Sequence, residues 1–351
     1  MAINKKIRAA VLGATGMVGQ RFVQLLSTHP WFEVSALAAS EKRAGQTYQE
    51  ACQWLLDGEM PASAAGLVLQ TAKPELDAQI VFSALPANIA RDIEPEFAKA
   101  GYAVCSNASA YRYEPDVPLL IPEINHEHIQ MIEQQRKKRG WKGLIATSPN
   151  CTTTAIAIPL KPLNEQFGIE KIFAVSMQAV SGAGYPGLSF LDIEDNVIPF
   201  IRGEEEKIEL ETRLLLGAWS GGKRIPAPIT ISAQANRVSV KDGHTVCLSV
   251  GLKQKPTLEE IVESLRNFKG SPGLPPLPSS PPQIIIVKDE EDRPQPRRDR
   301  DANAGMSVSV GRVRACPILD FRMVAVSHNT LRGAAGGSVL NAELLAVAGY
   351  L

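Results

Sequence analysis

The first part of the chain alternates between short apolar runs and helical periodicity. Residues Ile7–Leu12 form an apolar run bounded by glycine, which predicts a buried parallel strand. Val18, Phe22, Leu25 and Leu26 then recur at helical spacing until His29-Pro30. Further strands are predicted at 32–38, 80–82 and 102–104, with a helix around 92–99. Strands that alternate with helices predict a parallel sheet, so residues 1–150 resemble a Rossmann-type nucleotide-binding domain.

The pattern changes after Cys151. Longer strands are predicted at 171–178, 232–240 and 245–252, and a helix begins at Thr257, which forms a capping-box pair with Glu260. Because few helices separate these strands, we expect residues 151–330 to form an α+β domain with a largely antiparallel or mixed sheet. A final helix over 331–351 is expected to pack back on the first domain.

Two segments of the second half read as loops. Six prolines fall between Pro272 and Pro282, which predicts an extended loop. Residues 288–301 are dense in charge of both signs and contain Arg293-Pro294-Gln295-Pro296-Arg297. A solvated loop and a contact between subunits both remain open for this segment.

Composition narrows the class of protein. The 351 residues are 44% hydrophobic and 21% charged, which is typical of a globular chain. Lys+Arg and Asp+Glu are 37 each, so there is no basic excess for nucleic acid. No apolar run approaches the ~18 residues of a membrane span. Five scattered cysteines do not form a disulfide framework, and no signal-peptide core is present. We expect a cytoplasmic protein that binds neither nucleic acid nor membrane.

A glycine loop follows the first strand. Gly13, Gly16 and Gly19 are spaced three apart and open a helix, whose free amides and dipole favour a phosphate. A tight turn without a ligand is the alternative. At the end of the second strand, Ser40 and Arg43 suit the extra phosphate of NADP, whereas Glu41 keeps NAD open. We favour NADP.

One cysteine has the context of a nucleophile. Cys151 follows Asn150 and precedes a predicted helix start, where the helix dipole is expected to lower the thiol pKa. The same amides, with Asn150, suit an oxyanion. The alternative is a buried core cysteine, which is our interpretation of Cys52 and Cys105.

A nucleophilic cysteine needs a base, and the chain has five histidines. His126 and His128 form an H-x-H pair, but no Cys or carboxylate spacing completes a metal site, so we expect no metal. His244 lies at a turn between two predicted strands, seven residues after Arg237, and both side chains can face one cleft.

Several motifs occur together and in order. They are Gly13-Ala14-Thr15-Gly16-Met17-Val18-Gly19, Ser106-Asn107-Ala108-Ser109, Pro149-Asn150-Cys151-Thr152-Thr153, Gln178-Ala179-Val180-Ser181-Gly182-Ala183-Gly184, Asp242-Gly243-His244, the proline–arginine run from Arg293, and Gly305-Met306-Ser307-Val308-Ser309-Val310-Gly311-Arg312. From about residue 7 to 350 the chain resembles the aspartate-semialdehyde dehydrogenase family, particularly its archaeal and fungal-like branch.

The resemblance implies a reaction and its catalytic residues. The family reduces L-aspartyl 4-phosphate with NADPH, releasing phosphate, within lysine, methionine and threonine biosynthesis. By this resemblance Cys151 attacks the acyl phosphate and forms a thioester, which hydride converts to a hemithioacetal and then to the aldehyde. His244 is the implied general acid/base and Gln178 the residue that orients the acyl intermediate.

The resemblance also implies the binding residues. Arg237 matches the arginine for the α-carboxylate and Glu204 the acid for the α-ammonium, while Lys207 and Arg112 match the phosphate ligands. A solvated helix face is the alternative for Glu204 and Lys207, and Glu205 replaces Glu204 if the register slips by one. The implied cofactor-binding residues are Gly13, Thr15, Gly16, Met17, Val18, Ser40, Arg43, Ser83, Leu85, Ser181, Gly182 and Asn329; Asn150 joins the substrate set.

Other functions remain possible on the same residues. An acyl-CoA reductase, such as a malonyl-CoA reductase, differs mainly in its leaving group, and an N-acetyl-glutamyl-phosphate reductase has no free ammonium for Glu204. A nucleotide-binding regulator without catalysis is a third class. The family forms dimers or dimers of dimers through the second domain, so we expect a homodimer or homotetramer.

Overall fold

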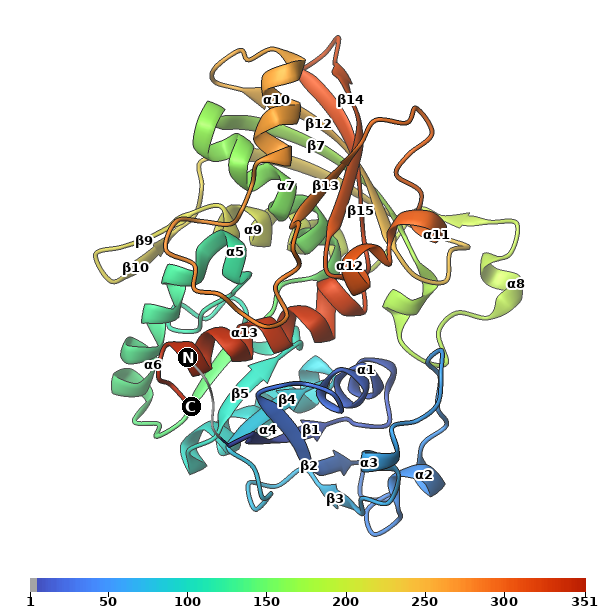
Figure 1. Ribbon diagram of the computed structural model, residues 1–351, viewed down its shortest axis with the longest axis vertical. Coiled ribbons are helices and arrows are strands. Elements are labelled where there is room, and N and C mark those ends of the chain that lie inside the picture. Colours follow the sequence, from blue (N-terminus) through green and yellow to red (C-terminus); the bar gives the residue numbers. More distant parts are fainter. Residues whose placement is uncertain (1–4) are drawn as a thin grey trace.

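Two β-sheets organise residues 5–351, the part of the chain that the computed structural model describes (Figure 1). The first sheet has six parallel strands in the order β3-β2-β1-β4-β5-β6. Its strands are β1 (Ile7–Leu12), β2 (Phe32–Ala39), β3 (Leu69–Thr71), β4 (Ile80–Ser83), β5 (Ala103–Ser106) and β6 (Leu144–Thr147). The strand order reverses between β1 and β4, and ligands of such sheets bind beyond the carboxyl ends of the strands at that point. The Rossmann-type prediction is therefore confirmed.

Helices cover both faces of this sheet, as parallel strands buried on both sides require. The helices are α1 (Met17–Leu26), α2 (Tyr48–Ala51), α3 (Ala62–Ala65), α4 (Ala87–Ala100), α5 (Pro122–Asn125) and α6 (Met131–Arg139), with the short turns η1 (Ser109–Tyr111) and η2 (His126–Gln130). Phe22 and Phe32 both pack on Phe82 at the centre of the core. Strands β3 and β6 were not predicted, because runs of three and four residues carry little periodicity.

The second sheet is mixed, as expected. Its seven strands run in the order β13-β14-β15-β12-β7-β11-β8, with parallel pairs only at β13·β14 and β7·β11. These strands are β7 (Ile169–Gln178), β8 (Val197–Ile198), β11 (Thr230–Val238), β12 (His244–Leu252), β13 (Ile285–Lys288), β14 (Val308–Ala315) and β15 (Phe321–Ser327); β9 (Ala218–Ser220) and β10 (Lys223–Ile225) form a separate hairpin.

One face of the second sheet is covered and the other is open. Helices α7 (Cys151–Phe167), α9 (Glu204–Leu215) and α10 (Leu258–Arg266) pack against the covered face. Thr257 caps α10 and forms the predicted capping box with Glu260. On the open face, Phe173 is 41% exposed, and Val175, Cys247 and Val324 form a half-buried row across three paired strands.

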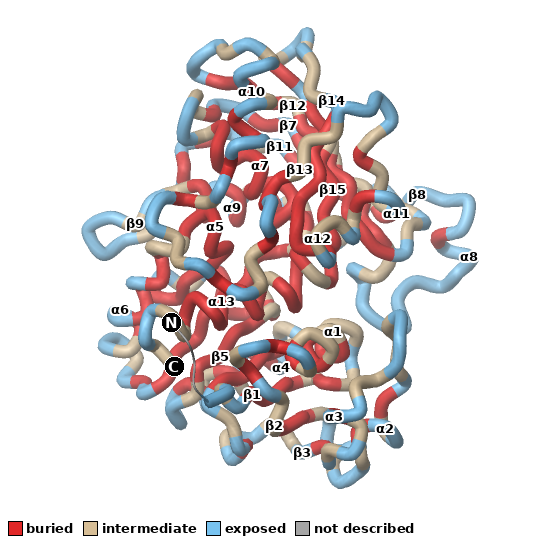
Figure 2. The backbone as a smooth tube through the Cα atoms, in the orientation of Figure 1, coloured by how far each residue is buried: buried red, intermediate tan, exposed pale blue. Residues whose placement is uncertain are grey.

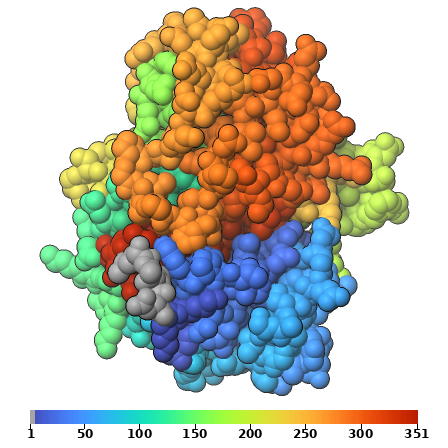
Figure 3. Space-filling view, in the orientation of Figure 1, coloured from blue at the N-terminus to red at the C-terminus, as the bar shows by residue number. Residues whose placement is uncertain are grey.

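The end of the chain returns to the first sheet. The predicted terminal helix is a π-helical turn, η4 (Leu331–Ala335), followed by α13 (Gly336–Val347), which contacts α1, α5 and β5. Buried Glu343 of α13 pairs with His29 at 2.7 Å and accepts hydrogen bonds from Ser279 of the proline-rich segment. That segment has no helix or strand, as predicted, and lies over the junction between the two halves (Figure 3).

The chain passes between the two sheets twice, and the two passages meet. The first runs from β6 into α7 at Cys151, and the second runs from β15 into η4. Helix α7 and η4 are in contact, and Gly333 of η4 lies so close that a Cβ there would come within 2.7 Å of the Cys151 Cβ. Glycine at this position allows the two passages to lie side by side.

The charged segment 288–301 is not simply a solvated loop. It contains α11 (Pro296–Asp299), followed by α12 (Ala302–Gly305), and Asp299 is buried against the Arg293 guanidinium at 2.8 Å. In contrast, the segment that carries α8 (Phe190–Ile193) projects from the molecule and exposes Phe190 and Leu191 (Figure 2). Among the helices of residues 5–351, none has the length and apolar character needed to cross a membrane.

Candidate active site

Cys151 and His244 meet at the junction of the two halves. Asn150 is the N-cap of α7, and its Oδ1 accepts the backbone N–H groups of Thr152 and Thr153 at 2.8 and 3.1 Å. This cap places Cys151 on the first turn of the helix. His244 is the buried first residue of β12, and its Nε2 lies 3.1 Å from the Cys151 Sγ. The predicted nucleophile and its partner therefore lie within hydrogen-bonding distance.

The electrostatics of the thiol differ from the sequence expectation. Burial, reinforced by the Glu204 carboxylate, raises the pKa of Cys151 to about 12, although Arg112, Arg237 and the Thr152 amide act in the opposite direction. The helix terminus was expected to lower this pKa, and that expectation was wrong, because desolvation penalises the thiolate more strongly. A raised pKa favours the neutral thiol over the thiolate at neutral pH.

His244 is neutral as well. Burial lowers its pKa to about 3, and the charge of Arg237 acts in the same direction. The Ala179 N–H donates to the His244 Nδ1 at 3.1 Å, so the neutral ring carries its proton on Nε2. In this state the ring donates a hydrogen bond to the sulfur, a geometry suited to stabilising a thiolate. Abstraction of the thiol proton at Nε2 requires the other tautomer, which the Ala179 amide opposes.

Three neighbouring strands bring the remaining predicted residues to the same edge of the sheet. Gln178 ends β7 and is paired in register with Arg237 near the end of β11, while His244 begins antiparallel β12. Arg237 donates to the Ala179 carbonyl at 2.7 Å. A Cβ on Gly182 would approach Arg237 Nη1 to 2.9 Å and His244 Cε1 to 3.1 Å, so any larger residue there would displace one of these side chains.

Glu204 contacts several of the predicted residues at once. It is the buried first residue of α9, and its Oε1 accepts hydrogen bonds from the side-chain amides of Asn150 at 2.8 Å and Gln178 at 3.1 Å. Lys207 lies 3.6 Å from the other oxygen of Glu204. Glu205 instead accepts the Ala235 amide, so the structure selects Glu204 rather than the register-shifted alternative.

Arg112 reaches the same centre through an acid that the sequence did not single out. Its guanidinium donates to Glu211 at 3.0 Å and to the Asn107 carbonyl at 2.7 Å. The second oxygen of Glu211 accepts the Asn150 backbone N–H at 2.6 Å. Glu211 lies seven residues after Glu204 on α9, so a search of that helix face for a second acid would have found it.

An open cleft of about 580 Å³ leads from the sulfur to the glycine loop. The loop fits a phosphate-bearing dinucleotide, because Gly13 has φ +73° and packs against the Ala84 carbonyl, which leaves no room for a Cβ. The predicted residues that line this cleft are Gly13, Thr15, Gly16, Met17, Val18, Leu85, Arg112, Asn150, Cys151, Ser181, Gly182 and Asn329. The other predicted residues lie outside this lining. His244 contacts the sulfur, the charges of Glu204 and Arg237 act on it, and Gln178 contacts Glu204.

A second hollow of about 660 Å³ continues from the glycine loop over the end of β2. Ser40, Glu41 and Arg43 line it, as expected for the distal end of a dinucleotide, and Thr71 and Lys73 face them from the end of β3. Thr71 and Lys73 were not among the predicted cofactor residues, because the short strand β3 that leads to them was not predicted. Lys73 adds a cation to the Ser40–Arg43 side of the hollow, which suits an extra phosphate.

Two predicted cofactor residues behave differently from the others. Ser83 is fully buried below the cleft with an unpaired Oγ, so the direct contact expected of it was wrong; Ala84 and Leu85 line the cleft instead. The side chain of Asn329 is engaged at both ends, donating to Ser181 Oγ and accepting the Gly243 N–H, each at 2.8 Å.

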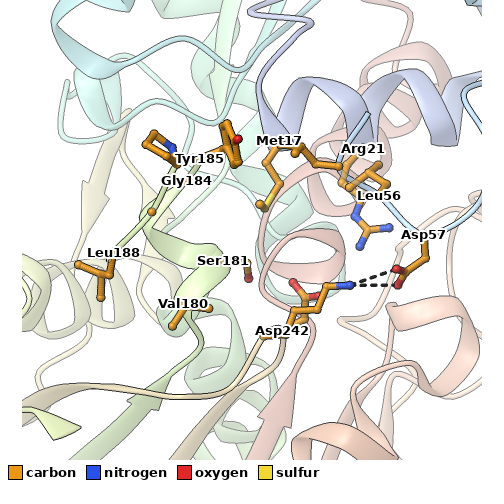
Figure 4. A pocket seen from close by; sticks show the side chains of 14 residues that line it. Met17, Arg21, Leu56, Asp57, Val180, Ser181, Gly184, Tyr185, Leu188 and Asp242 are labelled. Atoms are coloured by element: carbon orange, nitrogen blue, oxygen red, sulfur yellow. Dashed lines mark hydrogen bonds and ion pairs between the residues drawn. The ribbon is translucent and has the colours of Figure 1, made fainter. Parts of the chain in front are cut away.

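A smaller pocket lies beside Ser181 and Asp242, between the two halves (Figure 4). Lys241 bridges to Asp57 across it at 3.1 Å, and Tyr185 donates to Gln53 at 3.1 Å. Lys241 lies three residues before His244 and Tyr185 lies in the turn that follows Ser181, so both contacts link the second half of the molecule to the first.

Comparison with known proteins places this geometry in a family. Residues 8–132 match the model of the semialdehyde dehydrogenase NAD binding domain, and residues 160–332 match that of the semialdehyde dehydrogenase dimerisation domain. The chain is 51% identical over 336 residues to aspartate-semialdehyde dehydrogenase of Archaeoglobus fulgidus, covering 95% of this chain and 96% of that one. The chain belongs to the aspartate-semialdehyde dehydrogenase family.

Solved structures and a fungal relative agree with this membership. The aspartate-semialdehyde dehydrogenase sequence of Candida albicans is 46% identical and is covered to 97%. The crystal structure of the Candida albicans enzyme with NADP superimposes with a TM-score of 0.90 at 44% identity, covering 99% of this chain and all of that one. Aspartate semialdehyde dehydrogenase II of Vibrio cholerae has a TM-score of 0.77 at 27% identity. The resemblance seen in the sequence motifs is confirmed.

The His126–His128 pair lies outside the candidate active site. His128 is buried, its Nδ1 meets the Asn125 side-chain amide at 3.1 Å, and burial lowers its pKa to about 4. Across residues 5–351 the structure has no cluster of three or more His, Cys, Asp or Glu side chains placed to hold a metal ion.

Proposed function

We propose that the protein catalyses the NADPH-dependent reductive dephosphorylation of L-aspartyl 4-phosphate to L-aspartate 4-semialdehyde. Membership of the aspartate-semialdehyde dehydrogenase family supports this function. The observation that carries it is the Cys151–His244 contact at 3.1 Å beside the Glu204 carboxylate and Arg237. A nucleophile, an ammonium ligand and a carboxylate ligand within one site are what an amino-acid acyl phosphate requires.

In this proposal Cys151 is the nucleophile. Its sulfur attacks the acyl carbon: a C–S bond forms, the acyl C–O bond to phosphate breaks, and the thiol proton leaves with the phosphate, which gives a thioester. The His244 Nε2–H stabilises the negative charge that develops on the sulfur during this attack, and again when the hemithioacetal collapses and the C–S bond breaks. The acid/base role expected of His244 would require the Ala179 amide to release Nδ1 first. Gln178 orients the acyl group and Asn150 supplies a donor to its oxygen.

Four charged side chains are proposed to recognise the substrate. Arg237 binds the α-carboxylate and Glu204 the α-ammonium, while Arg112 and Lys207 bind the phosphate. Three of these side chains already have internal ion-pair partners, since Arg112 pairs with Glu211 and Lys207 lies 3.6 Å from Glu204. Substrate binding would exchange these internal contacts for contacts with its own charged groups.

NADP is the proposed cofactor, and when bound it supplies or accepts the hydride. The loop from Gly13 to Val18 would hold its pyrophosphate at the α1 N-terminus, with Ser181, Gly182 and Asn329 beside the nicotinamide. Ser40 and Arg43, with Lys73, would hold the 2′-phosphate, for which these hydroxyl and cationic groups are suited. Glu41 would weaken that preference, so NAD is the comparison cofactor in the assay.

We also propose that the function divides along the chain. Residues 1–150, with the returning helix 331–351, would bind the cofactor, and residues 151–330 would supply catalysis and the dimer contact. The open face of the second sheet around Phe173 supports a homodimer, and pairing of dimers would give a tetramer. The five unpaired cysteines are consistent with a cytoplasmic location, where thiols stay reduced.

The decisive experiment is a cofactor-reduction assay in the phosphorolytic direction. Purified protein receives L-aspartate semialdehyde, phosphate and NADP, with NAD as a parallel cofactor and Cys151→Ala as a parallel variant. We expect phosphate-dependent NADPH formation that the variant lacks. If no NADPH forms in this assay but NADPH is oxidised with malonyl-CoA, the Glu204 and Arg237 assignments are overturned in favour of an acyl-CoA reductase.

A further inference from the structure

The proline–arginine segment has an internal anchor that the reaction does not explain. Asp299 is buried and accepts hydrogen bonds from the Arg293 Nε at 2.8 Å and from the Gln295 amide at 2.6 Å. The Lys288 ammonium lies 3.3 Å away on its other side. A buried carboxylate with this many donors is held firmly. The anchor therefore fixes the position of the next residue, Arg300.

Arg300 and its helix lie directly on the turn that precedes His244. The Arg300 Nη1 donates to the Asp242 carbonyl at 2.9 Å. A Cβ on Gly243 would lie 3.1 Å from both the Pro296 and the Arg300 Cβ atoms, so α11 packs tightly over this glycine. Gly243 also has φ +97°, a conformation that side chains with a Cβ rarely adopt.

Asn329 holds the other end of the same peptide unit. Its Oδ1 accepts the Gly243 N–H at 2.8 Å, while Arg300 holds the Asp242 C=O of that peptide. A peptide next to glycine in a turn flips easily when its two polar ends are free. Here both ends are fixed, from two different elements. The residue that follows is His244, whose ring must reach Cys151.

We propose that Arg300 is a positioning residue, which clamps the Asp242–Gly243 peptide and thereby holds the His244 ring against Cys151. The expected effect on kcat rests on the proposed function. The expected effect on Cys151 reactivity does not, since it depends only on the contact between His244 and the sulfur. Arg300 itself touches neither the cleft nor the sulfur. Its loss should misplace the imidazole while leaving the cofactor loop unchanged.

The test compares Arg300→Met, which keeps the apolar stem but no donor, with Arg300→Lys, which keeps one donor. Arg298→Met is the matched control, because Arg298 lies two residues away on the same segment and is 60% exposed. We expect Arg300→Met to lower kcat about 10-fold, since small misplacements of catalytic groups have effects of this order, with the KM for NADP unchanged. Arg300→Lys should recover most of the loss.

A second measurement separates this inference from the proposed function. The rate of Cys151 alkylation by iodoacetamide needs no substrate, and it should fall in Arg300→Met and His244→Asn but not in Arg298→Met. An active wild-type enzyme with unchanged kcat and alkylation in Arg300→Met would overturn the clamp. A wild-type protein inactive on aspartate semialdehyde, with alkylation still dependent on Arg300, would overturn the proposed substrate and leave the clamp standing.

Discussion

At the scale of single residues, the site depends on two neutral partners in close contact. Cys151 has its pKa raised to about 12 and His244 has its pKa lowered to about 3, both chiefly by burial. Both shifts disfavour an ion pair between thiolate and imidazolium.

This protonation state predicts the pH dependence of Cys151 reactivity. Because the thiolate is the reactive form, the alkylation rate should rise with pH and still be rising at about pH 9.5, above the ordinary thiol pKa of ~8.5. No inflection should occur near pH ~6.5, where an exposed histidine titrates. Iodoacetamide kinetics across this range test the prediction, and a plateau that begins near neutrality would show that the ion pair forms.

A glycine next to the histidine gives a second residue-scale prediction. In Gly182→Ala the new Cβ would meet Arg237 and His244 at about 3 Å, so one of them must move. We expect kcat/KM to fall ~10²-fold with an unchanged melting temperature, because the loop is exposed. Gly66→Ala, where no atom lies within 4 Å, is the control and should behave as wild type.

The sequence predicted which residues meet at the junction of the two halves, but it did not predict their protonation. Cys151 and Glu204 were found from local spacing and motif resemblance. The predicted direction of the Cys151 pKa shift was wrong because the shift depends on how far the fold removes water from the thiol. Residues that are distant in sequence contribute to that burial. Glu211 was missed although its spacing of seven residues from Glu204 puts it on the same helix face, but its contact with the Asn150 amide is visible only in the fold.

At the scale of elements, the N-terminus of α7 joins helix stability to chemistry. Asn150 caps two backbone amides and also donates to Glu204. The sequence predicted a helix that starts after Cys151, whereas α7 begins at Cys151 itself. Elements with strong periodicity, such as α1, were predicted well, while β3 and β6 were too short to show a pattern.

Two helix caps make a matched pair of variants. Asn150→Ala should reduce the free energy of unfolding by about 1–2 kcal/mol and lower kcat by a further ~10²-fold, because it removes a donor at the site as well as a cap. Thr257→Ala removes the cap of α10 and should cost about 1 kcal/mol with kcat unchanged. Denaturant titration and steady-state kinetics on both variants check this, and equal kcat values would contradict the role of Asn150.

At the scale of the whole molecule, the second sheet has one face without a covering layer. Half-buried apolar side chains lie in a row across that face, which is unusual for a protein surface left in water. In the first half, in contrast, the alternation of strands and helices was enough to predict a parallel sheet with both faces covered by helices. Nothing in a single sequence tells a covered sheet face from one that a second copy covers.

The open face predicts the effect of a charge placed at its centre. Phe173→Glu should convert the proposed dimer to a monomer, because an unpaired carboxylate in the interface is costly to desolvate. Light scattering of the purified protein should then report half the wild-type mass. Val68→Glu, at a 52% exposed position in the first half, should leave the mass unchanged. A Phe173→Glu protein that keeps the wild-type mass would exclude this face as the interface.

The adjacent passages of the chain at Cys151 and Gly333 also have a mechanical consequence. Two covalent connections that lie side by side define a hinge axis, and rotation of one half against the other displaces atoms in proportion to their distance from that axis. The sulfur lies at the pivot, and its partner His244 belongs to the same half. Any rotation about these connections would therefore displace the far end of the cleft around Ser40 more than the Cys151–His244 pair.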